Sequence, residues 1–230
     1  MPPLTAPEFR SELLALATEE QRVKYQRFFP GDDSFVGVRM GDVFALAKSA
    51  LEMPVAEIER LLEDEVHEVR AGACSVMGKA ATHKKVEPER HGELYALLRR
   101  RHDRIDTWDL VDLVAAQVVG SWLRDRPRDP LYELADSEFW PERRTAIVST
   151  AALIKRGDTG DAFAISEFLL RDDEVFVQKG AGWMLRYAGD SSPEALRTFL
   201  DEHAPAMPRV MLRMAIEKLP KETRAAYLAA

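Results

Sequence analysis

The sequence predicts an all-α protein made of repeated helix pairs, and three observations support this fold class. Apolar residues recur at the spacing of an amphipathic helix along most of the chain, as at Leu94, Leu97 and Leu98. Strand-like alternation is confined to SFVGVRM (34–40), where nearby glycines suit an irregular connection better than a sheet. The third observation is an internal repeat, which relates the helices to one another.

Helical spacing and chain breaks place the elements in order. Helix-like apolar spacing appears in turn at 13–16, 43–47, 94–98, 168–169 and 212–216. Proline and glycine interrupt it at 30–31, 54, 88, 127–130, 157–160, 189–192, 205–208 and 220. Such residues end helices because proline lacks an amide donor and glycine is flexible. The breaks leave room for about ten to twelve helices of ordinary length.

Four segments share a cation followed by small residues, and they recur at a nearly constant step. They are EVHEVRAGACSVM (65–77), FWPERRTAIVSTA (139–151), EVFVQKGAGWMLR (174–186) and MPRVMLRMAIEKL (207–219), aligned on Arg70, Arg144, Lys179 and Arg213. The later steps are 35 and 34 residues, and the first is 74, or two steps of 37. This period is typical of a HEAT-like solenoid, in which the second helix of each pair lines a concave face. The small residues would let helices approach closely, and the cations could form a stabilising ladder.

One repeat in this series lacks its cation. WDLVDLVAAQ (108–117) lies near the middle of the long gap, and aligning its small residues 114–116 brings Asp112 into or beside the cation column. The steps on either side are then 42 and 32 residues. We expect Asp106 to cap this helix and Asp109 to lie in its first turn, where a carboxylate is favourable.

Length and composition bound the remaining possibilities. The chain has 230 residues, 46% hydrophobic and 31% charged, which is enough for one HEAT-like repeat domain over 1–230. No run approaches the ~20 apolar residues of a membrane span. MPPLTAPEFRSELLA also lacks a basic region followed by an apolar block, so we expect a cytoplasmic protein, a monomer that does not bind membranes. Cys74 has no second cysteine for a disulfide or metal site and is simplest as a buried hydrophobe.

Charge is distributed unevenly along the chain. The net charge of −7 argues mildly against nucleic-acid binding, but residues 66–104 hold 9 Lys+Arg against 5 Asp+Glu. Residues 1–65 hold 7 against 13, and residues 105–230 hold 16 against 21. The run RRRHDR (99–104) is either a solvated helix end or a phosphate-facing strip. Its place directly before the Asp112 helix favours the second interpretation.

Three tryptophans each share a helical face with an ion at a spacing of four residues. The pairs are Trp108 with Asp112, Trp140 with Arg144, and Lys179 with Trp183, with Arg186 a turn further on. If these side chains line one surface, it is a groove with aromatic plates, cations and one carboxylate. The alternative is that the tryptophans fill the core and the ions bind caps or neighbours. Coincidence in three repeats favours the groove.

A carboxylate in a cationic groove would repel DNA, so it needs a positive partner. One such partner is the sugar cation that forms when an N-glycosidic bond breaks. An anion below the ring can stabilise that cation and hold the attacking water, while indole faces attract cationic groups. An alkylated base is already positively charged and leaves without a general acid. No lysine in the Asp112 helix could serve as a nucleophile, which suits simple hydrolysis.

The sequence resembles the AlkD-like DNA alkylation repair glycosylases, which are built of HEAT-like repeats. The resemblance covers nearly the whole chain. It lies in VKYQRFFP and FVGVRMGDVFALAK (within 23–48), TWDLVD (107–112), FWPERRTAI (139–147) and VQKGAGWMLRYAG (177–189). It implies excision of positively charged N3- and N7-alkylpurines from duplex DNA, without a cofactor or metal and without drawing the base into a pocket.

The same resemblance implies roles for individual residues. Asp112 matches the family's catalytic carboxylate, and Trp108 and Trp183 match aromatic residues that contact the deoxyribose of the lesion. Arg144 matches a backbone-binding arginine and Tyr25 an N-terminal aromatic residue at the groove. Lys179 and Arg186 complete the predicted DNA-binding set through their spacing. Pro141 departs from the pattern, because a helix that starts there would turn Trp140 away from the groove.

Two other functions remain as alternatives. A non-catalytic HEAT-repeat scaffold that binds protein or structured nucleic acid belongs to a different class, and solenoids commonly serve that purpose. A metal hydrolase using Asp106, Asp109 and Asp112 is less favoured, because side chains at i, i+3 and i+6 drift around a helix and no histidine accompanies them closely in sequence.

Overall fold

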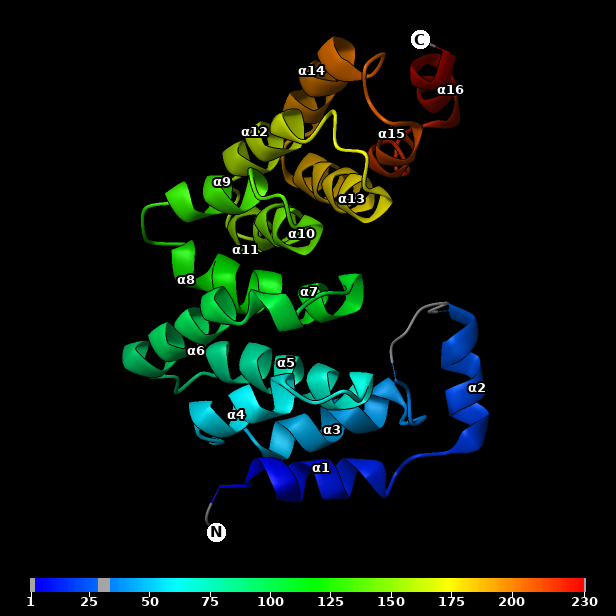
Figure 1. The fold of residues 1–230 in the computed structure, drawn as a ribbon. Helices are drawn as coiled ribbons and strands as arrows, with labels where there is room; N and C mark the ends of the chain where they lie inside the picture. The colour runs from blue at the N-terminus through cyan, green and yellow to red at the C-terminus, as the bar shows by residue number, and fades with distance from the viewer. Residues whose placement is uncertain (1–2, 29–33, 230) are drawn as a thin grey trace. The chain divides into compact units, whose positions relative to one another are not determined.

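A computed structural model of the protein describes residues 3–28 and 34–229, and every regular element within them is a helix (Figure 1). The predicted all-α class is therefore confirmed. SFVGVRM is the expected irregular connection, with an isolated bridge between Ser34 and Val66. The predicted break at 30–31 lies outside the described residues. No described helix combines the length and apolar character needed to cross a membrane.

The chain forms two compact units, Met1–Val118 and Val119–Ala230. The helices of the first unit are α1 (Ala6–Leu14), α2 (Glu19–Phe28), α3 (Met40–Ser49), α4 (Val55–Leu62), α5 (His67–Ala81), α6 (Pro88–Arg100) and α7 (Trp108–Val114), with a short 3-10 turn at His102–Arg104. Two predicted breaks begin helices here: Pro54 precedes α4, and Pro88 opens α6, where its missing amide costs nothing.

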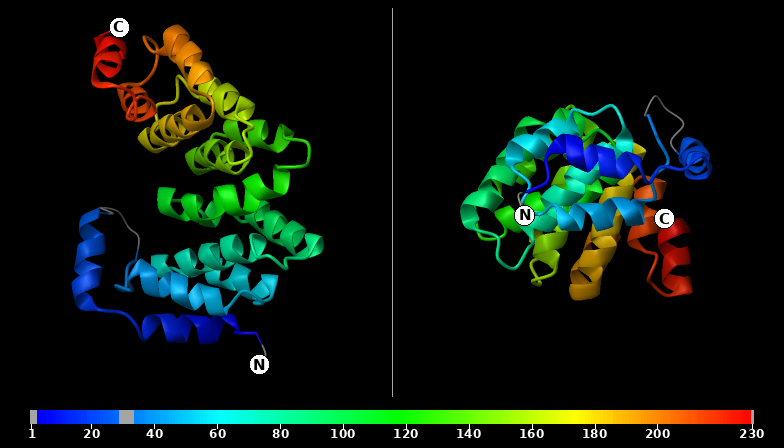
Figure 2. Two further views of the ribbon diagram at one scale, coloured as in Figure 1. Left: turned by 180° about the vertical axis from the view of Figure 1, so that it is seen from behind. Right: turned by 90° about the horizontal axis from the view of Figure 1, so that it is seen from below.

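Helix α5 is the centre of the first unit. It packs against α3, α4 and α7, and it lies between them in the views of Figures 1 and 2. Every α5 residue except Lys79 is buried. A Cβ atom on Gly78 would come within 2.4 Å of the backbone oxygen of Leu113. The small residues therefore do let neighbouring helices approach closely, as the repeat pattern predicts.

The second unit begins within a π-helical turn, Ala115–Gly120, that follows α7. Its helices are α8 (Ser121–Leu123), α9 (Asp129–Ala135), α10 (Trp140–Ser149), α11 (Ala151–Ile154), α12 (Gly160–Phe168), α13 (Val175–Ser191), α14 (Pro193–His203), α15 (Arg209–Ala215) and α16 (Lys221–Ala229). A Cβ atom on Gly120 would lie 2.1 Å from the backbone oxygen of Ser149, so this turn also depends on a small residue.

Helix α13 organises the second unit as α5 organises the first. It packs against α10, α12, α14 and α15. A Cβ atom on Gly182 would lie 2.4 Å from the backbone oxygen of Met211, which explains the close approach of α15. The predicted break at 189–192 is confirmed at Ser192, where α13 ends, but Gly189 itself lies inside α13. A Cβ atom there would meet Leu196 at 2.3 Å, so this glycine permits packing against α14 and does not end the helix.

Candidate active site

Helix α7 carries the candidate catalytic pair of the first unit. Thr107 precedes it with extended backbone angles, φ −123° and ψ 157°, and the helix begins at Trp108. Leu110, Val111 and Val114 are buried and fix one face of the helix against the core. Trp108 is 37% exposed, and Asp112, four residues later, is half-buried. The indole and the carboxylate therefore share a face of α7 that the core leaves accessible.

Asp106 pairs with a buried arginine and does not cap the helix. The expectation that it is the N-cap was wrong, because Thr107 holds that position. One Asp106 oxygen accepts a hydrogen bond from Arg70 Nη2 on α5 at 3.3 Å. Arg70 is only 4% exposed, so burial of its charge requires a partner. Arg70 of the cation column thus links α5 to the connection that precedes α7.

Asp109 lies in the first turn of α7, as expected, and pairs with a histidine that the sequence analysis missed. Its two oxygens lie 2.7 Å from His67 Nε2 and 2.7 Å from the hydroxyl of Thr107. Burial raises the pKa of Asp109, but the hydrogen bond and charge of His67 outweigh it, and the net pKa is lowered. Asp109 is therefore ionised, and the imidazole Nε2–H donates to it.

The three carboxylates at 106, 109 and 112 thus have different surroundings. Asp106 binds Arg70, Asp109 binds His67, and Asp112 lies with Trp108 on the accessible face. Within residues 3–28 and 34–229, no group of three or more histidine, cysteine or acidic side chains is arranged to hold a metal ion. Cys74 is fully buried on α5, and burial raises the pKa of its thiol, which disfavours the nucleophilic thiolate.

Tyr25, on α2, is linked to the same part of the first unit. Its hydroxyl donates to the backbone oxygen of Val38 at 3.1 Å and accepts from the Met40 amide at 3.2 Å. Its ring lies 5.5 Å from that of Phe35, which in turn lies 4.7 Å from the His67 ring. Burial raises the pKa of Tyr25. The hydroxyl therefore fastens α2 to the connection before α3, and the ring is half-buried, while its contact with DNA stays a prediction.

A buried glutamate holds that connection in place. Glu68 is inaccessible to solvent, and its carboxylate accepts hydrogen bonds from the amides of Val36, Gly37 and Val38 at 2.8–3.2 Å. Gly37 has φ +91°, and a Cβ atom on it would meet the Thr18 backbone oxygen at 2.0 Å. Three aligned amides compensate the buried charge. His67 and Glu68 together connect α5 to both α7 and the segment beside Tyr25.

In the second unit, Phe176 contacts Trp140 and two predicted site residues, Lys179 and Arg144. Trp140 stacks on its ring at 5.5 Å, and Lys179 Nζ lies 5.4 Å from the ring centre. Arg144 is 5% exposed and donates from Nη1 to the backbone oxygen of Phe176. Helix α10 begins at Trp140 with Pro141 in its first turn, as Pro141 led us to expect. Arg144 thus links α10 to α13, while its role in binding DNA stays a prediction.

Lys179, Trp183 and Arg186 follow one another along α13. Lys179 is exposed and Trp183 is half-buried one turn later. Arg186 is 22% exposed at its side chain and forms an ion pair with Glu217, beyond α15. The structure places these three side chains in the second unit and Tyr25, Trp108 and Asp112 in the first. Trp108 and Asp112 share α7, and Lys179 and Trp183 share α13, as their spacing requires, while their roles at a site stay predictions.

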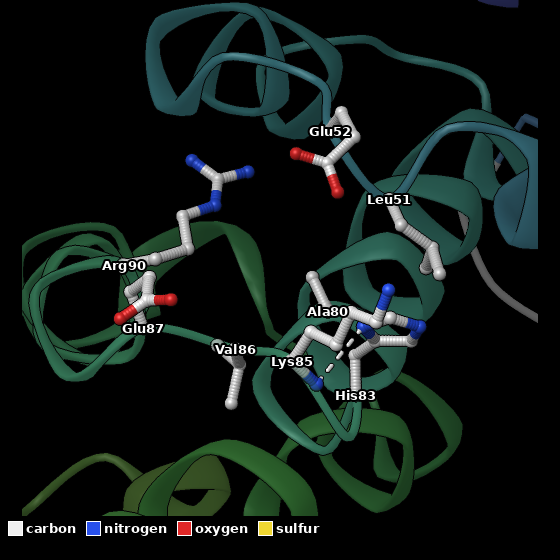
Figure 3. Close-up of a pocket in the computed structure, with 8 residues that line it drawn as sticks. All are labelled: Leu51, Glu52, Ala80, His83, Lys85, Val86, Glu87 and Arg90. Atoms are coloured by element: carbon white, nitrogen blue, oxygen red, sulfur yellow. Dashed lines mark hydrogen bonds between the residues drawn. The ribbon is translucent and has the colours of Figure 1, made fainter.

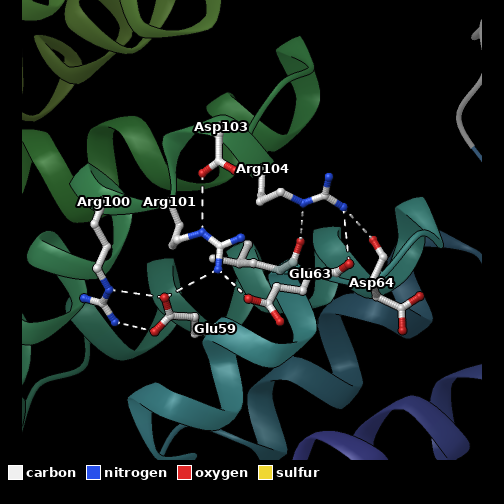
Figure 4. Close-up of polar contacts among 8 residues, drawn as sticks. Glu59, Glu63, Asp64, Arg100, Arg101, Asp103 and Arg104 are labelled. Atoms are coloured by element: carbon white, nitrogen blue, oxygen red, sulfur yellow. Dashed lines mark hydrogen bonds and ion pairs between the residues drawn. The ribbon is translucent and has the colours of Figure 1, made fainter.

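The arginine run before α7 forms a clamp in which Arg100, Arg101 and Arg104 bind protein groups, which favours a structural role over the phosphate-facing strip (Figure 4). Arg100 pairs with Glu59 at 2.5 Å and Arg101 with Glu63 at 2.7 Å. Arg104 donates to the backbone oxygens of residues 62–64 at 3.1–3.3 Å. These bonds satisfy the carbonyls at the end of α4, where a cation is favourable.

A separate pocket in the first unit contains none of the predicted site residues. Its volume is about 200 Å³, and it lies between the turn that follows α3, the end of α5 and the start of α6 (Figure 3). Its charged lining includes Glu52, Glu87, Lys85 and Arg90, and Arg90 also donates to the backbone oxygen of Met53. Because both acidic and basic side chains line this pocket, it favours neither an anionic nor a cationic ligand.

The fold and the site define a class: an all-helical protein that presents an indole and a carboxylate on one helix face. Residues 9–219 match the family model described as "DNA alkylation repair enzyme", and the chain belongs to that family. Membership indicates an enzyme that acts in the repair of alkylated DNA.

A solved structure has the same fold as this chain. It is described as a predicted DNA alkylation repair enzyme from Enterococcus faecalis, with 19% sequence identity and a TM-score of 0.70. The similarity covers 89% of this chain and 97% of that chain. A search of curated proteins found no match.

Proposed function

We propose that this protein is a monofunctional DNA glycosylase that excises positively charged N3- and N7-alkylated purines from duplex DNA. The observation that carries the proposal is the pair on α7. Asp106 and Asp109 bind buried side chains of α5, whereas Asp112 shares an accessible face with the 37% exposed indole of Trp108. The helix therefore presents one carboxylate beside an aromatic surface.

This pair has the chemistry that the reaction requires. When the bond between C1′ and the base nitrogen breaks, its electron pair leaves with the base, which becomes neutral. The positive charge that develops on the sugar is stabilised by the Asp112 carboxylate and the face of Trp108. Water then bonds to C1′ and gives a proton to Asp112 or to solvent. No acid is needed for departure, because the base is cationic from the start.

We further propose that the DNA-binding residues are those that the sequence identifies. Trp183 would contact the deoxyribose of the lesion, and Tyr25 would present its ring to the DNA. Lys179, Arg186 and Arg144 would bind phosphates, although Arg144 would have to reach them from a buried position. The HEAT-like repeat, an AlkD-like lesion range, a cytoplasmic location and a monomeric state belong to the same proposal.

The decisive experiment measures release of free methylpurines from methylated duplex DNA. The native protein should release base well above buffer, and Asp112→Asn should reduce the rate by roughly 10²-fold or more, typical of losing a transition-state charge. Asp42→Asn is the matched control, because Asp42 is exposed in the first turn of α3. Release that survives unchanged in Asp112→Asn would disprove the mechanism.

Trp183→Ala tests the aromatic contribution in the same assay. We expect slower release with an unchanged melting temperature, because the indole is half-buried at the surface of α13. Global unfolding would instead indicate that Trp183 fills the core.

The alternative function is a non-catalytic repeat scaffold that binds protein or structured nucleic acid. Tight DNA binding by native protein that releases no more base than buffer would favour it over the glycosylase.

A further inference from the structure

A cleft with a cationic rim lies between α15 and α16 in the second unit. Its volume is about 350 Å³. Arg213, Lys221 and Arg224 contribute its cations, and Ile216 and Leu228 contribute apolar surface. Glu217 also lines the cleft, and we name these six residues the C-terminal cleft. Ile216 is 1% exposed, whereas Arg213 and Lys221 are exposed, so an apolar interior lies below a charged rim.

The charge of this region is opposite to that of the whole protein. Residues 205–230 contain five Lys+Arg and two Glu, although the chain carries a net charge of −7. Glu217 is the acidic residue that lines the cleft, and it forms an ion pair with Arg186. Its negative charge is thus already compensated from α13. Lys218, in contrast, points to a different partner, Asp190.

We propose that the C-terminal cleft binds the phosphodiester backbone of duplex DNA. The proposal rests on the proposed function, in which the substrate is duplex DNA, and it extends the DNA-binding residues beyond those that the sequence identified. Arginine and lysine are the side chains that bind phosphate, and two guanidinium groups allow paired donors to one phosphate. A rim with three cations selects an anion that is itself extended.

The cleft is continuous with the helix that is predicted to bind DNA. Helix α15 packs closely on α13, where Gly182 permits the backbone contact with Met211. The Arg186–Glu217 ion pair joins the predicted DNA-binding side of α13 to the edge of the cleft. Arg224 donates to the backbone oxygen of Glu217 at 3.5 Å, a long bond that leaves other guanidinium donors for a ligand.

Two of the cleft cations lie beyond the reach of the family comparison. The family match ends at residue 219, whereas Lys221 and Arg224 are on α16. Their placement next to Arg213 comes from the tertiary structure alone.

The test measures binding of an undamaged fluorescent DNA duplex as a function of salt. Each phosphate contact contributes roughly 0.9 to the slope of log affinity against log salt concentration. We expect the double variant Lys221→Gln/Arg224→Gln to bind several-fold more weakly and to lower the slope by about 1.8. The matched control is Lys155→Gln/Arg171→Gln, which removes the same charge from exposed positions of the same unit.

The slope separates a contact from a general change in net charge, because both double variants have the same charge. A slope equal to that of the control would overturn the proposal. Melting temperatures of both variants verify the fold, and single variants replace any double variant that unfolds. Base release from methylated DNA is measured separately. Native protein that binds DNA through the cleft but releases no base would retain this inference and refute the glycosylase.

Discussion

Asp109 and Asp112 are one helical turn apart, yet the structure gives them different surroundings. Asp109 is 20% exposed at its side chain and binds His67, which is 1% exposed. Asp112 is half-buried on the face that carries Trp108. The same residue type therefore serves stability in one position and, in our proposal, chemistry in the other. Because the two side chains are chemically identical, only their burial and their neighbours distinguish these roles.

The Asp109 carboxylate predicts a pH-dependent stability. Asp109→Asn removes the charge that His67 donates to, and it should lower the free energy of unfolding by roughly 1–2 kcal/mol at pH 7. The folded pKa of Asp109 is below its ordinary value of 3.8. The contribution is therefore fully present above about pH 4 and is lost as pH falls through the folded pKa. Urea unfolding at pH 7 and at pH 3 measures this change.

Asp136→Asn is the control for that experiment, because Asp136 is exposed. It should keep the native pH dependence, whereas Asp109→Asn should flatten it. Equal pH profiles for Asp109→Asn and the native protein would contradict the assigned pairing.

At the scale of helices, glycine positions control how closely elements approach. Gly182 faces backbone of the segment Arg209–Ala215, whereas nothing lies within 4 Å of a Cβ atom placed on Gly41 of α3. Both glycines lie in helices, where alanine is intrinsically preferred. The packing partner therefore determines whether replacing the glycine with alanine stabilises or destabilises the protein.

Gly182→Ala should destabilise the protein by about 1–3 kcal/mol, since its Cβ atom would lie 2.4 Å from the Met211 backbone oxygen. Gly41→Ala should leave stability unchanged or raise it by up to about 1 kcal/mol. Thermal unfolding of both variants checks the contrast. A neutral Gly182→Ala would mean that α13 and α15 pack less closely than described.

The clamp between α4 and α6 gives a second prediction at this scale. Glu59→Gln removes the carboxylate that Arg100 and Arg101 share, and should cost less than about 1 kcal/mol because the pair is partly solvated. The hydrogen bond from Arg100 lowers the pKa of Glu59 below its ordinary 4.5. This contribution is therefore lost only as pH falls below about 4.5 and through the folded pKa. Chemical denaturation at two pH values measures it.

The same clamp predicts an absence of effect on DNA. Arg100→Gln should leave the salt dependence of DNA binding unchanged, because Arg100 binds Glu59. A slope reduced by about 0.9 would restore the phosphate-facing interpretation.

At the scale of the molecule, an acidic protein that binds DNA must overcome its own charge. The net charge is −7 at pH 7, and the sequence pI is about 5.4. Binding of undamaged duplex should therefore strengthen roughly several-fold between pH 8 and pH 6 at constant ionic strength, as net repulsion falls. Fluorescence anisotropy measures the affinity, and circular dichroism verifies the fold at each pH. Affinity independent of pH would indicate that local cations alone control binding.

Local patterns were sufficient for much of the fold. Helical spacing predicted the all-α class, the predicted breaks at Pro54 and Pro88 fall where α4 and α6 begin, and Pro141 lies in the first turn of α10. These features depend on neighbours within a turn or two, which a sequence contains directly. Gly189 does not itself end α13, because this glycine makes room for Leu196 on the following helix.

The candidate site shows the same division. Spacing placed Trp108 with Asp112 and Lys179 with Trp183, and the family motifs agreed with the family match over residues 9–219. The spacing pattern did not reveal the partner of Asp109, because His67 is 42 residues away in sequence. The charge distribution along the sequence places Glu63 in an acidic segment and Arg101 in a basic one. In the folded chain these two residues form an ion pair.

The amino-acid order therefore defines the helices, their faces and the family, because periodicity and motifs are local properties. Packing of distant helices determines which charged groups neutralise each other: Arg70 with Asp106, His67 with Asp109, and Arg101 with Glu63. The same packing brings Arg213 beside Lys221 and Arg224 at the C-terminal cleft. A charge acts through its distance to other charges, and distances between helices exist only in the folded chain.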